Sequence, residues 1–347
     1  MIKTLCFASL LLIFSCSSDK QNSDSDANNS IVFDDAETIT NYSNQIMADA
    51  LKTHVYTLAS DKFEGRATGS IGFDKASDFV RSYYMDMGIT PPSSNPDYYQ
   101  RIPQGYFSSA IPPSQNVVAY IEGSEKPEEV IIISAHLDHM GTVNDVIYYG
   151  ADDNASGTAA VMEIAKAFAM AKKEGHGPKR SLLFLHLTAE ELGLYGSQYY
   201  IDKPIFPLDK TIANLNIDMI GRVDPAYQFK KQENYVYLIG ADRLSTRLHD
   251  ISEAANKKFT NLILDYTYNA EDDKNRYYYR SDHYNFALQN IPVIFYNNGE
   301  HPDYHKPSDT PDKINYPILQ KRTQLIFCTA WYLANMPDRL PLNKPNQ

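Results

Sequence analysis

Short apolar runs alternate with longer amphipathic segments along most of this chain. The apolar runs predict strands over 98–102, 116–121, 130–136, 181–187, 212–220, 235–239, 262–268 and 291–296. The amphipathic segments predict helices over 35–60, 155–173, 193–202, 244–259, 282–289 and 314–333, and another that ends at Gly88. Alternating strands and helices predict an α/β fold, with a mostly parallel, mixed sheet flanked by helices on both faces.

Composition and net charge narrow the range of possible architectures and functions. The 347 residues contain 43% hydrophobic residues, enough for a sizeable core, and no break after residue 40 is long enough for a domain linker, so we expect one domain over 41–340. A net charge of −11 argues against a nucleic-acid-binding face, which would need a basic patch. Cys6, Cys16 and Cys328 are too few and too far apart for a disulfide framework.

The first sixteen residues are typical of an export signal. One lysine precedes an apolar run that is too short to span a bilayer, and the ending Ile13-Phe14-Ser15-Cys16 resembles a bacterial lipobox. We expect residues 1–15 to be a lipoprotein signal peptide and Cys16 to be lipidated, with a plain signal peptide as the alternative. Residues 16–40 are then a polar, disordered tether. The protein would be exported and anchored to the cell envelope, in a Gram-negative bacterium at the outer membrane, facing the periplasm or the cell surface.

Polar residues stand where the predicted apolar strands end. They are His136, Asp138, His139, Glu190, Glu191, Asp218, His301 and His305, and Asp152 and Asp153 precede the helix over 155–173. Each has a structural explanation alone, such as a helix cap, a charged first turn or a hydrogen-bonded core histidine. The carboxyl ends of parallel strands meet at one edge, however, where ligands bind in open α/β sheets. Carboxylates and imidazoles gathered there predict a site for two divalent metal ions.

Two adjacent metal ions need a shared ligand, usually a carboxylate with one oxygen on each ion. Asp153 is the candidate for this bridge. A hydrolytic site also needs a free carboxylate that takes a proton from water. Glu190 and Glu191 can divide these roles because neighbouring residues at a strand end point in different directions.

Six segments of the chain resemble a known family. They are LASDKFEGRATGSIGFDKASDFV, SAHLDH, GADDNASG, TAEELGLYGS, NIDMIGR and DYHKPSDTPDKINY, spread over about residues 50–335. In this order they resemble the co-catalytic zinc exopeptidases of the bacterial leucyl aminopeptidase and aminopeptidase Y type. The resemblance implies the zinc-exopeptidase, phosphorylase/hydrolase-like fold, two zinc ions per chain and peptide substrates with a free N-terminus.

The resemblance also implies roles for individual residues. It makes Asp153 the bridging ligand, with His136 and Asp218 on one zinc ion and Glu191 and His305 on the other. It makes Glu190 the general base, Tyr304 the phenol that steadies the oxyanion, and Asp138 the carboxylate that orients His136. It further implies a cis peptide bond between Asp153 and Asn154.

The segment over 281–286 has a less defined role. Ser281 is expected to cap the helix that follows it, and Asp282 and His283 are left out of the metal ligands. Two alternatives to a di-zinc aminopeptidase stay open: a glutaminyl cyclase-like acyltransferase with a single zinc, and a non-catalytic surface binding module. The sequence leaves side-chain preference and oligomeric state open.

Overall fold

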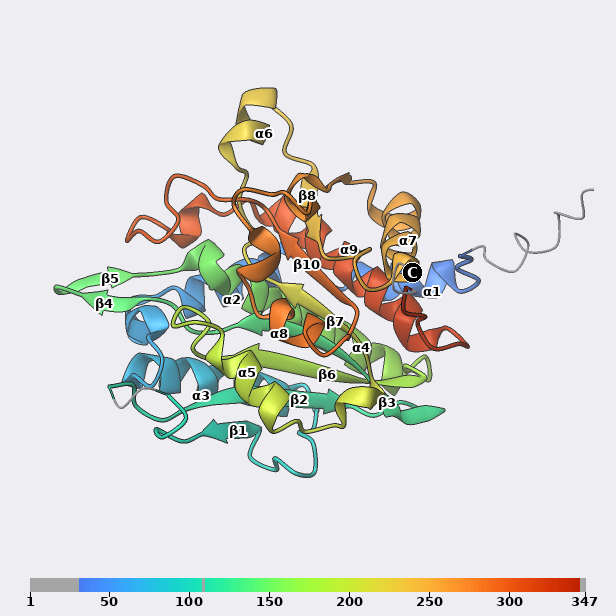
Figure 1. Ribbon diagram of the computed structural model, residues 1–347, viewed down its shortest axis with the longest axis horizontal. Coiled ribbons are helices and arrows are strands. Elements are labelled where there is room, and N and C mark those ends of the chain that lie inside the picture. The colour runs from blue at the N-terminus through green and yellow to red at the C-terminus, as the bar shows by residue number, and fades with distance from the viewer. Residues whose placement is uncertain (1–30, 108–109, 344–347) are drawn as a thin grey trace, which may run out of the picture. The chain divides into compact units, whose positions relative to one another are not determined.

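An eight-stranded mixed sheet lies at the centre of the unit that begins at Phe33 (Figure 1). The computed structural model describes residues 31–107 and 110–343. The strand order is β1-β2-β6-β3-β7-β10-β8-β9. The strands are β1 (Tyr99–Ile102), β2 (Ser114–Ile121), β3 (Lys126–His136), β6 (Arg180–Leu187), β7 (Thr211–Ile217), β8 (Tyr235–Ile239), β9 (Ile263–Asp265) and β10 (Val293–Asn297).

The four central strands are parallel, so their carboxyl ends share one edge. β3 pairs in parallel with β6 and β7, and β7 pairs in parallel with β10, whereas β2 and β8 join the group antiparallel. β6 and β7 are buried at every position. Strands covered on both faces read as near-continuous apolar runs, as β6 does, whereas β7 also contains the buried Asn214 and Asn216. The predicted mostly parallel, mixed sheet is confirmed.

Helices cover both faces of this sheet (Figure 1). They are α1 (Ala36–Ser43), α2 (Ala48–Leu58), α3 (Ile71–Asp86), α4 (Gly157–Lys173), α5 (Tyr195–Asp202), α6 (Pro225–Lys230), α7 (Thr246–Ala255), α8 (His283–Ala287) and α9 (Tyr316–Asn335). On one face α5 and α8 pack Tyr200 and Phe286 onto apolar side chains of β2, β3 and β6. On the other, α4 contacts β3 and α9 contacts β6. The α/β class is therefore confirmed.

Several boundaries differ from the sequence-based prediction. The segment over 35–60 forms two helices instead of one, and α1 begins inside the range expected for the tether. An unpredicted hairpin joins β4 (Gly141–Val143) and β5 (Val146–Tyr148). Its turn residues Asn144 and Asp145 both have positive φ, as two-residue hairpin turns require. The hairpin places two short strands between the end of β3 and Asp153.

The N-terminal predictions lie outside the described part of the chain. The signal peptide over 1–15, the lipidated Cys16 and most of the tether all fall within residues 1–30. Within 31–107 and 110–343, no helix combines the length and the apolar character that crossing a membrane requires.

Candidate metal centre

The ends of the parallel strands bring the predicted ligands together. His136 ends β3, Glu190 and Glu191 follow β6, and Asp218 follows β7. His305 lies in the loop after β10, and Asp153 lies in the irregular turn Ala151–Ser156 before α4. Although His136 and His305 are far apart in sequence, both reach Asp153. The expected gathering at one sheet edge is what the structure contains.

Asp153 divides its two carboxylate oxygens between two groups of side chains. Oδ1 lies 3.3 Å from Nε2 of His136, which is also 3.2 Å from Oδ1 of Asp218. Oδ2 lies 3.1 Å from Nε2 of His305, which is also 3.0 Å from Oε2 of Glu191. Donor atoms at about 2.0–2.2 Å from a tetrahedral zinc lie roughly 3.3 Å apart. Both groups therefore have the spacing and the nitrogen and oxygen donors that zinc takes.

The ionisation of these groups also fits a cation site. Burial alone would lower the pKa of His136, but the carboxylates of Asp218 and Glu190 raise it well above its usual value. Burial alone would raise the pKa of Asp153, but hydrogen bonds from His136 and His305 hold it well below its usual value. Protonated imidazoles thus supply the positive charge that the carboxylates need, and a bound metal would replace those protons.

The backbone around Asp153 is held by a second carboxylate. Oδ2 of Asp309 accepts hydrogen bonds from the N–H groups of Asp152 and Asp153, at 2.9 and 3.1 Å. The Asp153–Asn154 peptide bond is cis, as the resemblance implies. Asp152 points elsewhere, since its Oδ1 accepts the N–H of Gly221 at 2.6 Å. The structure thus directs Asp153, and not its neighbour, toward the other candidate ligands.

A chain of buried polar side chains runs through the sheet to Asp218. Asn214 donates to Ser134, Ser134 to Asn216, and Asn216 to Ser281, at 2.8 to 2.9 Å. Oγ of Ser281 then donates to Oδ2 of Asp218 at 2.7 Å. The expectation that Ser281 caps a helix is therefore wrong, because no side chain caps α8 and the hydroxyl is committed to Asp218. In the sequence, the alternating polar residues of IANLNID indicate this series of hydrogen-bonded side chains.

The resemblance implies that the Asp138 carboxylate orients His136, but in the structure this carboxylate has other partners. Nδ1 of His136 lies 3.0 Å from the main-chain carbonyl oxygen of Asp138 and 3.9 Å from its carboxylate. The carbonyl is thus the nearer acceptor for that ring nitrogen. The carboxylate instead accepts the N–H of Glu190 and the hydroxyl of Thr68, both at 3.1 Å. Asp138 thereby fixes the start of the Glu190–Glu191 segment.

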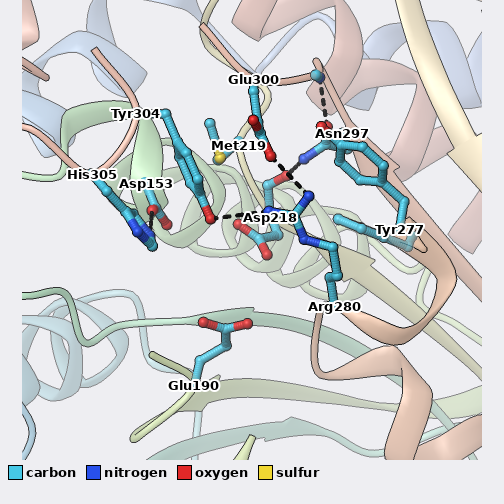
Figure 2. A pocket seen from close by; sticks show the side chains of 12 residues that line it. Asp153, Glu190, Asp218, Met219, Tyr277, Arg280, Asn297, Glu300, Tyr304 and His305 are labelled. Atoms are coloured by element: carbon cyan, nitrogen blue, oxygen red, sulfur yellow. Dashed lines mark hydrogen bonds and ion pairs between the residues drawn. The ribbon is translucent and has the colours of Figure 1, made fainter. Parts of the chain in front are cut away.

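Glu190 and Tyr304 face the space beside the ligands (Figure 2). Ala189 has a φ of 56°, and this left-handed turn redirects the chain as β6 ends, so that Glu190 lines a cavity with Asp153 and Asp218. Burial and the nearby carboxylates of Asp218 and Glu191 raise the pKa of Glu190 well above its usual value. Tyr304 directs its hydroxyl into the same space, where Arg280 approaches it to 3.5 Å.

Charged and aromatic side chains form the rest of this cavity. Arg280 pairs with Glu300 at 2.8 Å and lies near Met219 and Tyr277 (Figure 2). Phe295 adds to the apolar lining. A second cavity of about 440 Å³ lies beside Glu191, and Ile111, Met140 and Leu192 are among its apolar lining residues. His305 lines both cavities, so the candidate ligands lie between them.

His139 is the residue that the sequence-based ligand set omitted. Its Nδ1 lies 2.8 Å from Oε1 of Glu191 and 3.7 Å from Oδ2 of Asp153, so it forms a tight group with these two carboxylates. Asp282 and His283 are buried but do not belong to either group of candidate ligands. His283 instead stacks on Phe295, with ring centroids 4.7 Å apart.

Several known proteins are similar to this chain in sequence or in fold. Leupeptin-inactivating enzyme 1 of Streptomyces exfoliatus is 33% identical over 172 residues, which is 49% of this chain, and the chain spans 35% of that relative's length. The LapA aminopeptidase of Legionella pneumophila superimposes with a TM-score of 0.68 at 20% identity, over 89% of this chain and 78% of that one. Glutaminyl cyclase of Porphyromonas gingivalis gives 0.65 at 17% identity, over 82% and 97%.

At these identities the two solved structures show a shared fold and no more. The match to a family is more specific, because it spans the segments that carry His136, Asp153, Glu191, Asp218 and His305. Peptidase family M28 matches residues 116–330, more than half of the sequence, and the chain therefore belongs to peptidase family M28.

Proposed function

We propose that this protein is a di-zinc aminopeptidase of the leucyl aminopeptidase and aminopeptidase Y type, which releases N-terminal residues from peptides. The observation that carries the proposal is the division of the two Asp153 oxygens between two groups of donors. His136 and Asp218 would complete one zinc site, and Glu191 and His305 the other. A single-zinc enzyme has no need of a carboxylate placed in this way.

The chain's own residues supply the remaining chemistry. Bound zinc would polarise the scissile carbonyl and lower the pKa of a water molecule. Glu190 is a carboxylate beside the two donor groups that belongs to neither, and it takes the proton from the attacking water and returns it to the leaving amine nitrogen. The Tyr304 hydroxyl donates a hydrogen bond to the oxygen that gains negative charge.

The charge of the cavity beside Glu190 supports recognition of a free N-terminus. The carboxylates of Asp153, Glu190, Asp218 and Glu300 line it, against the positive charges of Arg280 and His305. Zinc would neutralise its ligands and Arg280 pairs with Glu300, but Glu190 remains to attract an α-ammonium group. A blocked N-terminus loses this attraction, so we expect N-acetylated peptides to be poor substrates.

Substitution of Glu190 tests the proposal. Glu190→Gln should keep two zinc ions while turnover of aminoacyl reporters falls by about 10²–10⁴-fold, the usual contribution of a general base. Glu163→Gln is the control, because Glu163 is a buried carboxylate that pairs with His54 and Lys166 away from the site. Near-normal turnover by Glu190→Gln would remove Glu190 from this role.

Zinc content and product chemistry separate the alternatives. One zinc per chain together with ring closure of N-terminal glutamine would favour the cyclase, whose fold this chain shares. No hydrolysis of any peptide or aminoacyl reporter in zinc-replete buffer would favour a binding module. Two zinc ions and release of free N-terminal residues are the expected result.

We also propose that the protein is exported and held on the cell envelope by a lipid on Cys16. The support is the sequence of residues 1–16, with its apolar run and the lipobox-like ending. Metabolic labelling with a lipid analogue should tag the wild type but not Cys16→Ala. Export of an untagged wild type would contradict the lipid anchor and favour a plain signal peptide.

A further inference from the structure

His139 contacts the metal centre but has no part in the mechanism above. Its side chain is fully buried, and its main-chain N–H donates to the carbonyl oxygen of Arg66 at 3.2 Å. The ring lies against Gly150, where an added Cβ would come within 2.5 Å of Cγ of His139. The structure thus reserves space for this imidazole, which could act as a third ligand beside Glu191 or as a hydrogen-bond donor to it.

The imidazoles of His139 and His305 both lie near Glu191, but their distances to the Glu191 and Asp153 carboxylates follow different patterns. Nε2 of His305 is almost equally far from the two carboxylates, at 3.0 and 3.1 Å, as expected for donors at the corners of a zinc site. Nδ1 of His139 is 2.8 Å from Glu191 but 3.7 Å from Asp153. A short contact to one oxygen and a long one to the other describes a hydrogen bond to Glu191.

The other ring nitrogen of His139 supports the same assignment. An imidazole that binds a metal through one nitrogen carries its proton on the other, which almost always donates to an acceptor. Nδ1 of His136 has such an acceptor, the Asp138 carbonyl at 3.0 Å. Nε2 of His139 is buried, and the described residues offer it no hydrogen-bond partner. A proton there would be an unsatisfied buried donor, so the proton belongs on Nδ1.

We infer that His139 is a positioning residue whose Nδ1–H donates to Oε1 of Glu191 and thereby leaves Oε2 for the metal. Oε2 is the oxygen that faces Nε2 of His305 at 3.0 Å. With Oε1 occupied by the imidazole, Glu191 binds zinc through one oxygen and keeps a fixed orientation. This inference rests on the proposed di-zinc function, because it concerns the zinc that Asp153, Glu191 and His305 would hold.

Zinc affinity measured by chelator competition tests the inference. His139→Phe keeps a ring but removes the donor, and we expect this zinc to bind about 10–100-fold more weakly, as is usual when a partner of a ligand is lost. His139→Asn restores an N–H near the position of Nδ1 and should recover most of the affinity. His186→Phe is the matched control, because His186 is fully buried with Nε2 paired to Tyr84 at 2.6 Å and Nδ1 unpaired.

Nitrogen NMR of the zinc-loaded wild type gives a second readout, because it distinguishes a protonated from a metal-bound ring nitrogen. We expect a protonated Nδ1 and a bare Nε2 at His139. Zinc on Nδ1 would overturn the inference and make His139 a ligand, and unchanged zinc affinity in His139→Phe would overturn it as well. A wild type that binds fewer than two zinc ions would instead defeat the proposed function, and this inference with it.

Discussion

Strands hold one half of the metal centre, and loops hold the other. In the strand half, His136 ends β3 and Asp218 directly follows β7, and their side chains are 1% and 10% exposed. In the loop half, Glu191 and His305 lie in connections, and the His305 side chain is 36% exposed. The polar chain through Ser281 supports the strand half from within the sheet. The difference predicts that, in the proposed di-zinc enzyme, the two zinc ions would not be equivalent, although the Asp153 carboxylate would hold both.

The largest effect should come from the residue that belongs to both halves. Asp153→Ala removes a ligand from each zinc, so we expect zinc content near zero and a loss of turnover beyond the about 10–100-fold typical of losing an outer partner. Metal analysis after dialysis measures this loss. Asp250→Ala, an exposed substitution on α7, is the control. Unchanged zinc stoichiometry in Asp153→Ala would disprove the bridge.

Chelation should separate the two halves in time. Because His305 is the exposed ligand, we expect the zinc of the loop half to leave first and give a one-zinc form. His305→Gln should bind a single zinc from the start. Zinc release followed with a colorimetric chelator tests this order. One phase that removes both ions together, from a wild type that binds two, would show that the halves do not differ.

Loss of the hydrogen bond from Ser281 to Asp218 should affect zinc binding less than loss of a ligand does. Ser281→Ala leaves Asn216 and Asp218 without their shared partner, which should cost about 1–3 kcal/mol of unfolding free energy and weaken the strand-half zinc about 10–100-fold. Ser245→Ala is the control, because Ser245 is buried and caps α7 away from the site. Urea unfolding and chelator competition measure the two effects. Equal zinc affinity in both variants would mean that the polar chain only stabilises the fold.

The smallest effect should be a pH dependence of the metal-free protein. Burial lowers the pKa of His305, but Asp153 and Glu191 outweigh this and raise it to about 10. Since the folded-state pKa exceeds the unfolded value near 6.5, the stabilisation is complete below pH 6.5 and is lost as the pH rises toward 10. We expect the stability difference between wild type and His305→Gln to shrink over this window in urea unfolding. A constant difference would contradict the ion pairs of the loop half.

Sequence patterns predicted the strand half better than the loop half. The apolar runs of β3 and β6, and the strand pattern of β7 with its two interspersed asparagines, predict where these strands end, and hence that His136, Glu190 and Asp218 share one edge. Boundaries failed where the chain turns within a few residues, as between α1 and α2. The helix periodicity continues across that break, so nothing in the pattern marks it.

The predictions of individual hydrogen-bond partners were wrong where the partner is a main-chain atom or a residue that is distant in sequence. Asp138 was expected to orient His136 through its carboxylate, but its carbonyl oxygen is the nearer acceptor. Ser281 was expected to cap α8, because a serine before a helix usually does so. It contacts Asp218 instead, since the packing of α8 against β7 and β10 brings its hydroxyl to that carboxylate.

The sequence by itself determined the α/β class, the sheet edge at which the site lies, and the carboxylates and imidazoles that meet there. These follow from the periods of strand and helix and from the shared direction of parallel strands. Only the tertiary structure decided that His139 contacts Glu191 and that Ser281 contacts Asp218. Each of these contacts joins segments that are more than fifty residues apart in sequence, and no local pattern encodes them.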